Sequence, residues 1–181
     1  FMSLKLDILD NNKILQDIQL PIKEVLISTD AIELSVNFIK NFLAKKIYLI
    51  VSDENTYKFL GEKILYRFKS ESKVNINSYI FANNIKANID NVEKLEVELK
   101  NIDMVFAVGS GTINDIVKLA CFRKNIPFVS FPTAPSVNAY SSPTASISVG
   151  EIKKSFPAKL PVAIFIDISH SKIPSRLIKA G

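Results

Sequence analysis

Apolar and polar positions along this chain follow two alternating spacings, one typical of helices and the other of buried strands. Apolar residues recur at helical spacing over residues 31–43, 57–68, 92–100 and from about 111 to 123. Short apolar runs, typical of strands, lie between these blocks at residues 47–51, 74–81, 103–108 and 126–131. This alternation predicts an α/β fold, with a mainly parallel sheet and helices on both of its faces.

The pattern changes at both ends of the chain. Residues 1–23 form an N-terminal segment without clear periodicity. Residues 132–146 are rich in Ser, Thr, Ala and Pro, which indicates a loop that crosses a ligand. Beyond this loop we expect two strands, at residues 146–150 and 161–168, joined as a β-hairpin with Lys153 and Lys154 in its turn. Pro174 is expected at the start of a last helix that the sequence cuts short.

Length, composition and charge narrow the class of protein. The chain has 181 residues, of which 48% are apolar, enough to bury a core. Its net charge is +5, but its lysines are interleaved with glutamates, which is typical of a solvated surface and not of a nucleic-acid-binding patch. No signal peptide or membrane span is visible, and the single cysteine, Cys121, fits a reducing compartment. We therefore expect a cytoplasmic protein that binds no nucleic acid.

The main chemical motif is a Gly-Ser-Gly turn between a predicted strand and a predicted helix. Gly109 and Gly111 allow a sharp turn and leave no Cβ between the backbone and a ligand. The N–H groups and the dipole of the following helix favour a phosphate or pyrophosphate over the turn. No Gly-Lys-Ser/Thr follows, which excludes a nucleoside-triphosphatase phosphate loop, and Asn114 stands where the dinucleotide fingerprint has its third glycine. A tight turn without a ligand is the alternative.

Other polar residues each have a functional and a structural interpretation. Asp53 follows a predicted strand, where it could bind a ribose hydroxyl or cap the helix that begins near Tyr57. Asp115 and Lys118 could form an ion pair at a spacing of three residues, or Asp115 could stabilise the glycine turn. His170 is the only histidine and is expected to be a bystander. One His and one Cys are too few of the usual ligands for a zinc site.

Several stretches, in this order, resemble one protein family. Residues 106–136, 141–149 and 156–169 are similar to the N-terminal half of glycerol-1-phosphate dehydrogenases, and residues 51–57 also fit their pattern. These enzymes belong to the superfamily of glycerol dehydrogenases, iron-dependent alcohol dehydrogenases and 3-dehydroquinate synthase. The resemblance covers residues 24–181.

The resemblance implies a domain organisation and a cofactor. It implies a Rossmann-like NAD(P)-binding domain over residues 24–173, with residues 174–181 as the truncated start of an all-helical C-terminal domain that is otherwise absent. The glycine turn would hold the pyrophosphate, the loop from Thr133 would line the nicotinamide, and Asp53 would hold the adenosine ribose and favour NAD over NADP. The implied cofactor-binding residues are Asp53, Gly109, Ser110, Gly111, Thr112, Ile113, Asn114, Asp115, Lys118, Thr133, Ala134, Pro135, Ser136 and Ser142.

Two departures from the family pattern concern the substrate and the metal. Asn138 stands where the family has an aspartate that contacts substrate, so we expect it to bind substrate without supplying a negative charge. The family's metal ligands would all lie beyond Gly181, so we assign no metal or catalytic residue within the chain. The divalent metal, expected to be zinc, would be bound by ligands outside these residues.

The function implied by the resemblance is hydride transfer between NAD(P) and a polyol phosphate. The complete enzyme would be a metal-dependent oxidoreductase that interconverts glycerol 1-phosphate, or a related polyol, and its ketone. These 181 residues alone would bind dinucleotide without turnover. The alternatives are a 3-dehydroquinate synthase-like lyase and a stand-alone nucleotide-binding module, and a homo-oligomer is left open.

Overall fold

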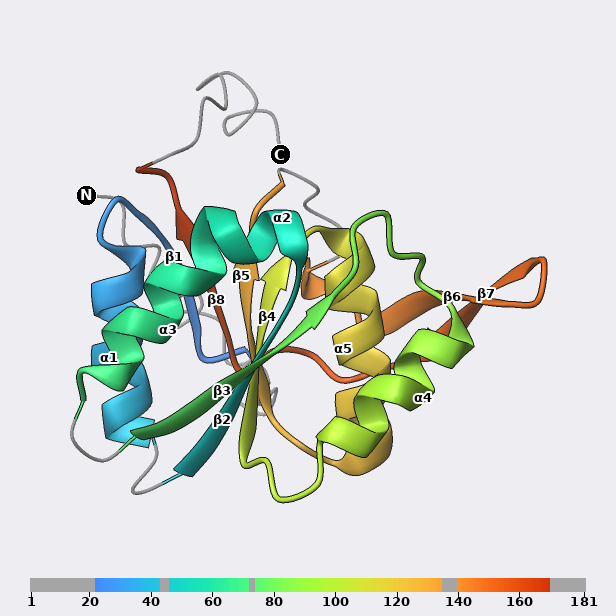
Figure 1. Ribbon diagram of the computed structural model, residues 1–181, viewed down its shortest axis with the longest axis horizontal. Helices are drawn as coiled ribbons and strands as arrows, with labels where there is room; N and C mark the ends of the chain where they lie inside the picture. Colours follow the sequence, from blue (N-terminus) through green and yellow to red (C-terminus); the bar gives the residue numbers. More distant parts are fainter. Residues whose placement is uncertain (1–21, 43–45, 72–73, 135–139, 170–181) are drawn as a thin grey trace, which may run out of the picture.

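The computed structural model describes residues 22–42, 46–71, 74–134 and 140–169. Within these residues, six parallel strands form one sheet in the order β1-β8-β5-β4-β2-β3 (Figure 1). The strands are β1 (Glu24–Ser28), β2 (Lys46–Asp53), β3 (Val74–Phe81), β4 (Met104–Gly109), β5 (Phe128–Pro132) and β8 (Ala163–Asp167). The predicted parallel α/β sheet is confirmed.

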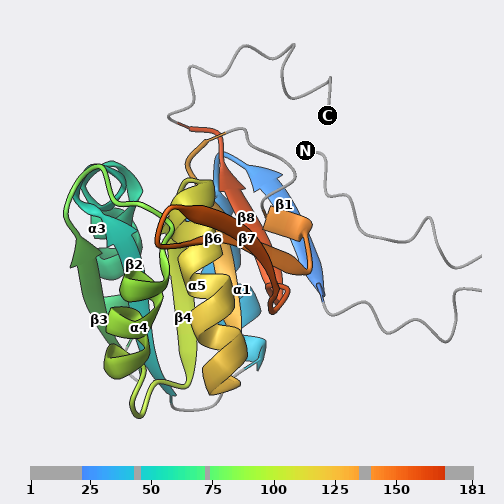
Figure 2. The same ribbon diagram turned by 90° about the vertical axis from the view of Figure 1, so that its right-hand side faces the viewer.

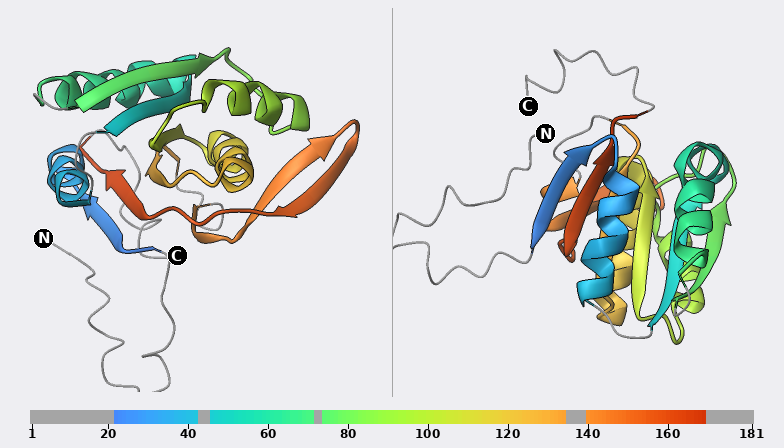
Figure 3. Two further views of the ribbon diagram at one scale, coloured as in Figure 1. Left: turned by 90° about the horizontal axis from the view of Figure 1, so that it is seen from below. Right: turned by 90° about the vertical axis from the view of Figure 1, so that its left-hand side faces the viewer.

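Helices cover both faces of this sheet, as predicted (Figure 3). One face carries α1 (Ala31–Phe42) and a continuous helical segment made of α2 (Glu54–Thr56), one π-helical turn η3 (Tyr57–Gly61) and α3 (Glu62–Lys69). The other face carries α4 (Ile89–Glu98) and α5 (Gly111–Lys124). The sequence placed the start of the second helix at Tyr57, whereas it begins at Glu54.

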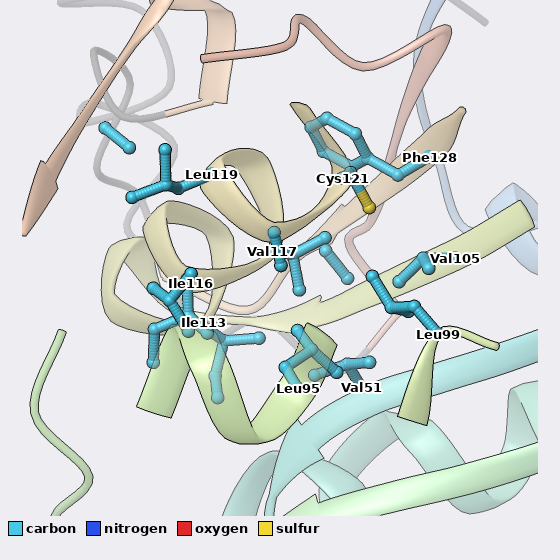
Figure 4. Packing of buried hydrophobic residues seen from close by; sticks show 14 of the residues in the cluster. Val51, Leu95, Leu99, Val105, Ile113, Ile116, Val117, Leu119, Cys121 and Phe128 are labelled. Atoms are coloured by element: carbon cyan, nitrogen blue, oxygen red, sulfur yellow. The ribbon is translucent and has the colours of Figure 1, made fainter. Parts of the chain in front are cut away.

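Each face of the sheet has its own hydrophobic core, because successive side chains of a strand point to opposite faces. Leu49 and Val51 of β2 pack toward α4 and α5, whereas Tyr48 and Ile50 pack toward α1 and α3. Figure 4 shows the first core, where residues of α5 such as Val117 meet the sheet. In the second core, the rings of Tyr48 and Phe106 are stacked with centroids 5.3 Å apart. The sheet is therefore buried on both faces, as its apolar runs indicated.

The β-hairpin is present, but its strands differ from the prediction. It consists of β6 (Thr144–Val149) and β7 (Ile152–Pro157), paired antiparallel, with the turn at Gly150 and Glu151. Gly150 has φ +60°, a left-handed conformation that favours glycine and turns the chain there. The assignment of Lys153 and Lys154 to the turn was therefore wrong, since both lie in β7.

The predicted strand at residues 161–168 is not part of the hairpin. It is β8, which lies between β1 and β5 in the main sheet. Apolar residues of β8, such as Phe165, are buried in the core packed against α1. A place inside the main sheet buries them, whereas an exposed hairpin would not. The loop predicted for residues 132–146 is also shorter, because β6 begins at Thr144. The helix expected from Pro174 lies outside the described residues.

The order of the strands creates a switch point between β2 and β4. From β2 the chain passes through α2, η3 and α3 on one face, and from β4 it passes through α5 on the other. The two strands are neighbours and parallel, so their carboxyl ends lie side by side. In open α/β sheets, a crevice that can hold a ligand lies outside the strand ends at such a point.

Candidate functional site

The glycine turn lies at the carboxyl end of β4, on this switch point. A Cβ added to Gly109 would lie 2.8 Å from both Cβ and Cγ1 of Ile113. No real side chain makes such a contact without moving the helix, so glycine is required for the close approach of α5 to its strand. Gly109 is not required because of a positive φ. Among the described glycines, the one with a positive φ is Gly150.

The N-terminus of α5 has no side-chain cap. Ser110 occupies the N-cap position, its side chain makes no capping hydrogen bond, and the first turn contains no acidic residue. The N–H of Asn114 donates to the Ser110 carbonyl at 3.1 Å, which closes the first turn. The N–H groups of the preceding residues 111–113 have no partner within the helix. The positive end of this helix is therefore suited to an anion.

Two other described helices have capped N-termini. Asp53 Oδ1 accepts the Thr56 N–H at 2.8 Å, and the Asp53 N–H donates to Thr56 Oγ1 at 3.2 Å, which makes a capping box. On α4, Asn88 Oδ1 accepts the Asn91 N–H at 3.0 Å. The start of α5 therefore differs from the starts of α2 and α4, which follow the usual capping rules.

Asp53 is the last residue of β2, the neighbour of the strand that ends in the glycine turn, and it caps its own helix. Val51 of β2 and Ala107 of β4 form the last pair of their ladder, and Asp53 and Gly109 end these two strands two residues further on. The capping interpretation of Asp53 is thus confirmed. The cap uses Oδ1 of the carboxylate. A role of the carboxylate toward a ribose stays a prediction.

The hairpin lies across α5 (Figure 2), and Asp115 and Lys118 are residues of this helix that bond the backbone of β6, at Ser146 and Thr144. Lys118 is fully buried, and its Nζ donates to the Thr144 carbonyl at 2.9 Å. Burial lowers the pKa of Lys118, and the neighbouring Asp115 opposes that shift. Burial also raises the pKa of Asp115, against the effect of the Lys118 charge. The pair is coupled electrostatically, and Lys118 joins α5 to β6.

The loop after β5 starts at the glycine turn. The Thr133 N–H donates to the Gly109 carbonyl at 3.1 Å. The Tyr140 hydroxyl donates to the Ala134 carbonyl at 3.0 Å, and burial raises the pKa of Tyr140 to about 12. Ser142 Oγ accepts the Thr144 N–H at 3.2 Å in a local turn. The described ends of this loop thus lie close to the N-terminus of α5.

Three of the expected site residues cannot be placed. Pro135 and Ser136, expected at the cofactor, and Asn138, expected at the substrate, lie outside the described residues, as does His170. Their roles stay predictions.

The structure also contains a buried polar contact that sequence reasoning missed. Ser130 Oγ donates to Asn114 Oδ1 at 3.1 Å, and both residues are 1% exposed. The signal in the sequence was a serine within the otherwise apolar strand 128–131.

Neither a metal centre nor a membrane-spanning helix occurs in the described part of the chain. Across those ranges, no three His, Cys, Asp or Glu side chains are grouped closely enough to hold a metal ion. Cys121 is fully buried, and burial raises the pKa of its thiol. The helices there are too short or too polar to cross a bilayer.

An open groove of about 460 Å³ lies elsewhere, between α1 and α3, and is lined by residues such as Asp30, Lys63 and Arg67. The Arg67 guanidinium in it is already paired with Glu33 and Glu71. This groove is separate from the glycine turn, and we do not assign the site to it.

Comparison with known proteins agrees with this geometry. Residues 26–172 match the family described as iron-containing alcohol dehydrogenase. The glycerol-1-phosphate dehydrogenase (NAD(P)+) of Pyrococcus abyssi is 35% identical over 163 residues, which are 88% of this chain and 45% of that protein. The protein of the same name from Bacillus subtilis is 32% identical over 170 residues, 90% of this chain and 43% of its own length. The chain therefore spans less than half the length of these relatives.

Solved structures share the fold. An iron-containing alcohol dehydrogenase superposes with a TM-score of 0.70 at 21% identity, over 83% of this chain and 47% of the other. The glycerol dehydrogenase of Schizosaccharomyces pombe gives 0.67 at 21% identity, over 79% and 36%. The family match extends over most of the chain, from β1 past the end of β8, and on that basis the chain belongs to the iron-containing alcohol dehydrogenase family.

Proposed function

We propose that this chain is the NAD(P)-binding part of a metal-dependent dehydrogenase that interconverts glycerol 1-phosphate, or a related polyol phosphate, and its ketone. The observation that carries the proposal is the uncapped N-terminus of α5 at the switch point between β2 and β4. The names of the relatives from Pyrococcus abyssi and Bacillus subtilis support the substrate class. They favour it over the lyase and over a module without catalysis.

In this proposal each part of the dinucleotide has a partner in the chain. The N–H groups of residues 111–113 bind the pyrophosphate, because they lack helical partners and carry the positive end of the helix dipole. Asp53 accepts hydrogen bonds from the adenosine ribose. The loop from Thr133 to Ser142 lines the nicotinamide, with Asn138 toward the substrate. When bound, NAD(P) supplies the hydride acceptor and donor.

The metal implied by the family does not fit the described residues of this chain. They provide no group of three ligands, so we place the ligands outside the described residues and derive no step through the metal. We propose zinc, because an ion without redox chemistry of its own suffices as a Lewis acid for hydride transfer. The site residues of this chain are then those that bind and orient the cofactor.

We also propose a cytoplasmic location and no nucleic-acid partner. The single buried cysteine supports the location. The interleaved charges of the surface support the absence of a nucleic-acid partner. Self-association into a homo-oligomer is compatible with the proposal but is not needed for cofactor binding.

The test is to place a carboxylate at the uncapped helix start. Ser110→Asp supplies a good N-cap and a negative charge where the pyrophosphate would bind. We expect the dissociation constant for NAD, measured by calorimetry, to rise about tenfold or more, while the melting temperature is unchanged or higher.

The matched control is Asn88→Asp at the N-cap of α4. It adds the same charge at the start of a helix that is already capped, and Asn88 lies beside Ser148 of the hairpin. Its NAD affinity should equal that of the wild type. If Ser110→Asp leaves NAD affinity unchanged, the pyrophosphate does not bind at α5 and the proposal is wrong.

A further inference from the structure

Two fully buried polar side chains meet beneath the first turn of α5. Ser130 Oγ donates to Asn114 Oδ1 at 3.1 Å. Ser130 lies on the same face of β5 as Phe128, which packs against α5, and Asn114 is the fourth residue of that helix. The hydrogen bond therefore joins the helix of the glycine turn to the strand that follows it.

Apolar side chains of α5 and of the strands beneath it pack in the same layer as this pair. Ala107, Ile113, Val117 and Phe128 all belong to the same buried cluster. Apolar contacts allow a helix to shift by small amounts, whereas a buried polar pair loses its hydrogen bond if either partner moves away. The pair thus fixes the position of the helix start relative to β5 more strictly than packing alone.

Asn114 connects this fixed point directly to the N–H groups of the turn. Its own N–H donates to the Ser110 carbonyl at 3.1 Å, so the same residue closes the first helical turn and anchors it sideways. In the dinucleotide fingerprint, a glycine at this position allows close packing of helix and strand. Here a side-chain hydrogen bond to the neighbouring strand takes the place of that close packing.

We propose that Ser130 is a positioning residue for the dinucleotide. Through Asn114 it holds the N–H groups of residues 111–113 in the orientation that binds pyrophosphate, an inference that rests on the proposed function. Donors that are already oriented need no ordering when the ligand binds, so loss of the Ser130 hydroxyl adds that cost to binding.

The first experiment compares two buried serines in the 181-residue chain. Ser130→Ala should raise the dissociation constant for NAD, measured by calorimetry, about three- to tenfold. Ser35 is the matched control, because it is also fully buried and its Oγ donates to the Ile32 carbonyl at 2.6 Å, within α1. Ser35→Ala should lower the melting temperature by a similar amount but leave NAD affinity unchanged. If the Ser130→Ala effect came only from a general loss of stability, both variants would show the same change in NAD affinity.

The second experiment tests whether Ser130 acts through Asn114. If it does, Asn114→Ala and Ser130→Ala should each weaken NAD binding, and the double variant should bind no more weakly than the weaker single variant. In the free proteins, Ser130→Ala should shift the amide NMR signals of residues 111–113, whereas Ser35→Ala should not.

Several outcomes would overturn the inference. These are unchanged affinity in Ser130→Ala, an equal loss in Ser35→Ala, or losses that multiply in the double variant. They leave the proposed function standing as long as the wild-type chain binds NAD. A wild-type chain that does not bind NAD would overturn the proposed function, and the inference with it.

Discussion

At the scale of single residues, several polar side chains combine a structural contact with a predicted role at the cofactor. Asp53 caps α2 at the end of β2, and Lys118 is buried and donates to the Thr144 carbonyl. Sequence reasoning found Asp53 from its place after a predicted strand and Lys118 from its place on the helix after the glycine turn. It could not find the bond between Ser130 and Asn114, because the partners are 16 residues apart and only the packing of β5 against α5 brings them together.

Asp53 allows a test of the choice between NAD and NADP. Asp53→Asn keeps a good N-cap but removes the charge that would repel a 2′-phosphate. We expect the ratio of NADP to NAD affinity, measured by calorimetry, to rise about tenfold with little change in melting temperature. Asp90→Asn, in the first turn of α4, is the control and should leave the ratio unchanged. An unchanged ratio in Asp53→Asn would show that Asp53 does not face the ribose.

At the scale of elements, the clearest agreement between sequence and structure is in the strands and helices of the main sheet. β3 has the bounds that were predicted, and α5 ends one residue beyond the predicted end, where Asn125 adopts φ +53° and its N–H caps the helix. Periodicity identifies such elements because each has one face or both faces buried. The predicted hairpin is present, but its second strand was assigned wrongly, since β7 is exposed along nearly its whole length and has no apolar periodicity.

Charged residues link α1 to α3 on the surface and give a pH dependence. Arg67 of α3 bonds Glu33 of α1, and its hydrogen bond holds the pKa of Glu33 below the ordinary value of 4.5. Glu71 also has a lowered pKa, chiefly because of Lys40 and then because of Arg67. A carboxylate with a lowered pKa stabilises the folded state above its unfolded pKa, and that stabilisation is lost as the pH falls through the folded pKa.

The expected result is that Arg67→Met lowers the melting temperature at pH 7 but has a smaller effect at pH 3, because the stabilisation from the two carboxylates declines as the pH falls below their unfolded pKa toward the lowered folded values. Circular dichroism melts at a series of pH values measure this. Lys94→Met removes an exposed lysine on α4 and should show no such dependence. An equal loss at both pH values would mean that the packing of the Arg67 stem, and not its charge, stabilises the contact.

At the scale of the whole molecule, the strand order places the site and also divides the molecule by stability. β4 pairs on both sides, with β2 and β5, and is buried along its full length. Within the described residues, β7 pairs with β6 alone and is exposed. Regions with few buried contacts open more readily than the centre of a sheet.

Amide hydrogen exchange should therefore be slowest in β4 and much faster in β7. Lys118→Met should speed exchange in β6 and β7 further, because it removes the bond from Nζ to the Thr144 carbonyl, while β4 keeps its protection. Slow exchange in β7, comparable with β4, would mean that the hairpin and the sheet unfold as one unit.

The sequence by itself determined the fold class, the glycine turn and the family resemblance. These depend on local features: the period of apolar residues, the small size of glycine and the order of motifs along the chain. Only the tertiary structure decided which strands are neighbours. It placed β8 between β1 and β5, made β2 and β4 neighbours and joined Ser130 to Asn114. The physical reason is that strand order and buried polar pairs depend on contacts between residues far apart in the chain, which no local pattern specifies.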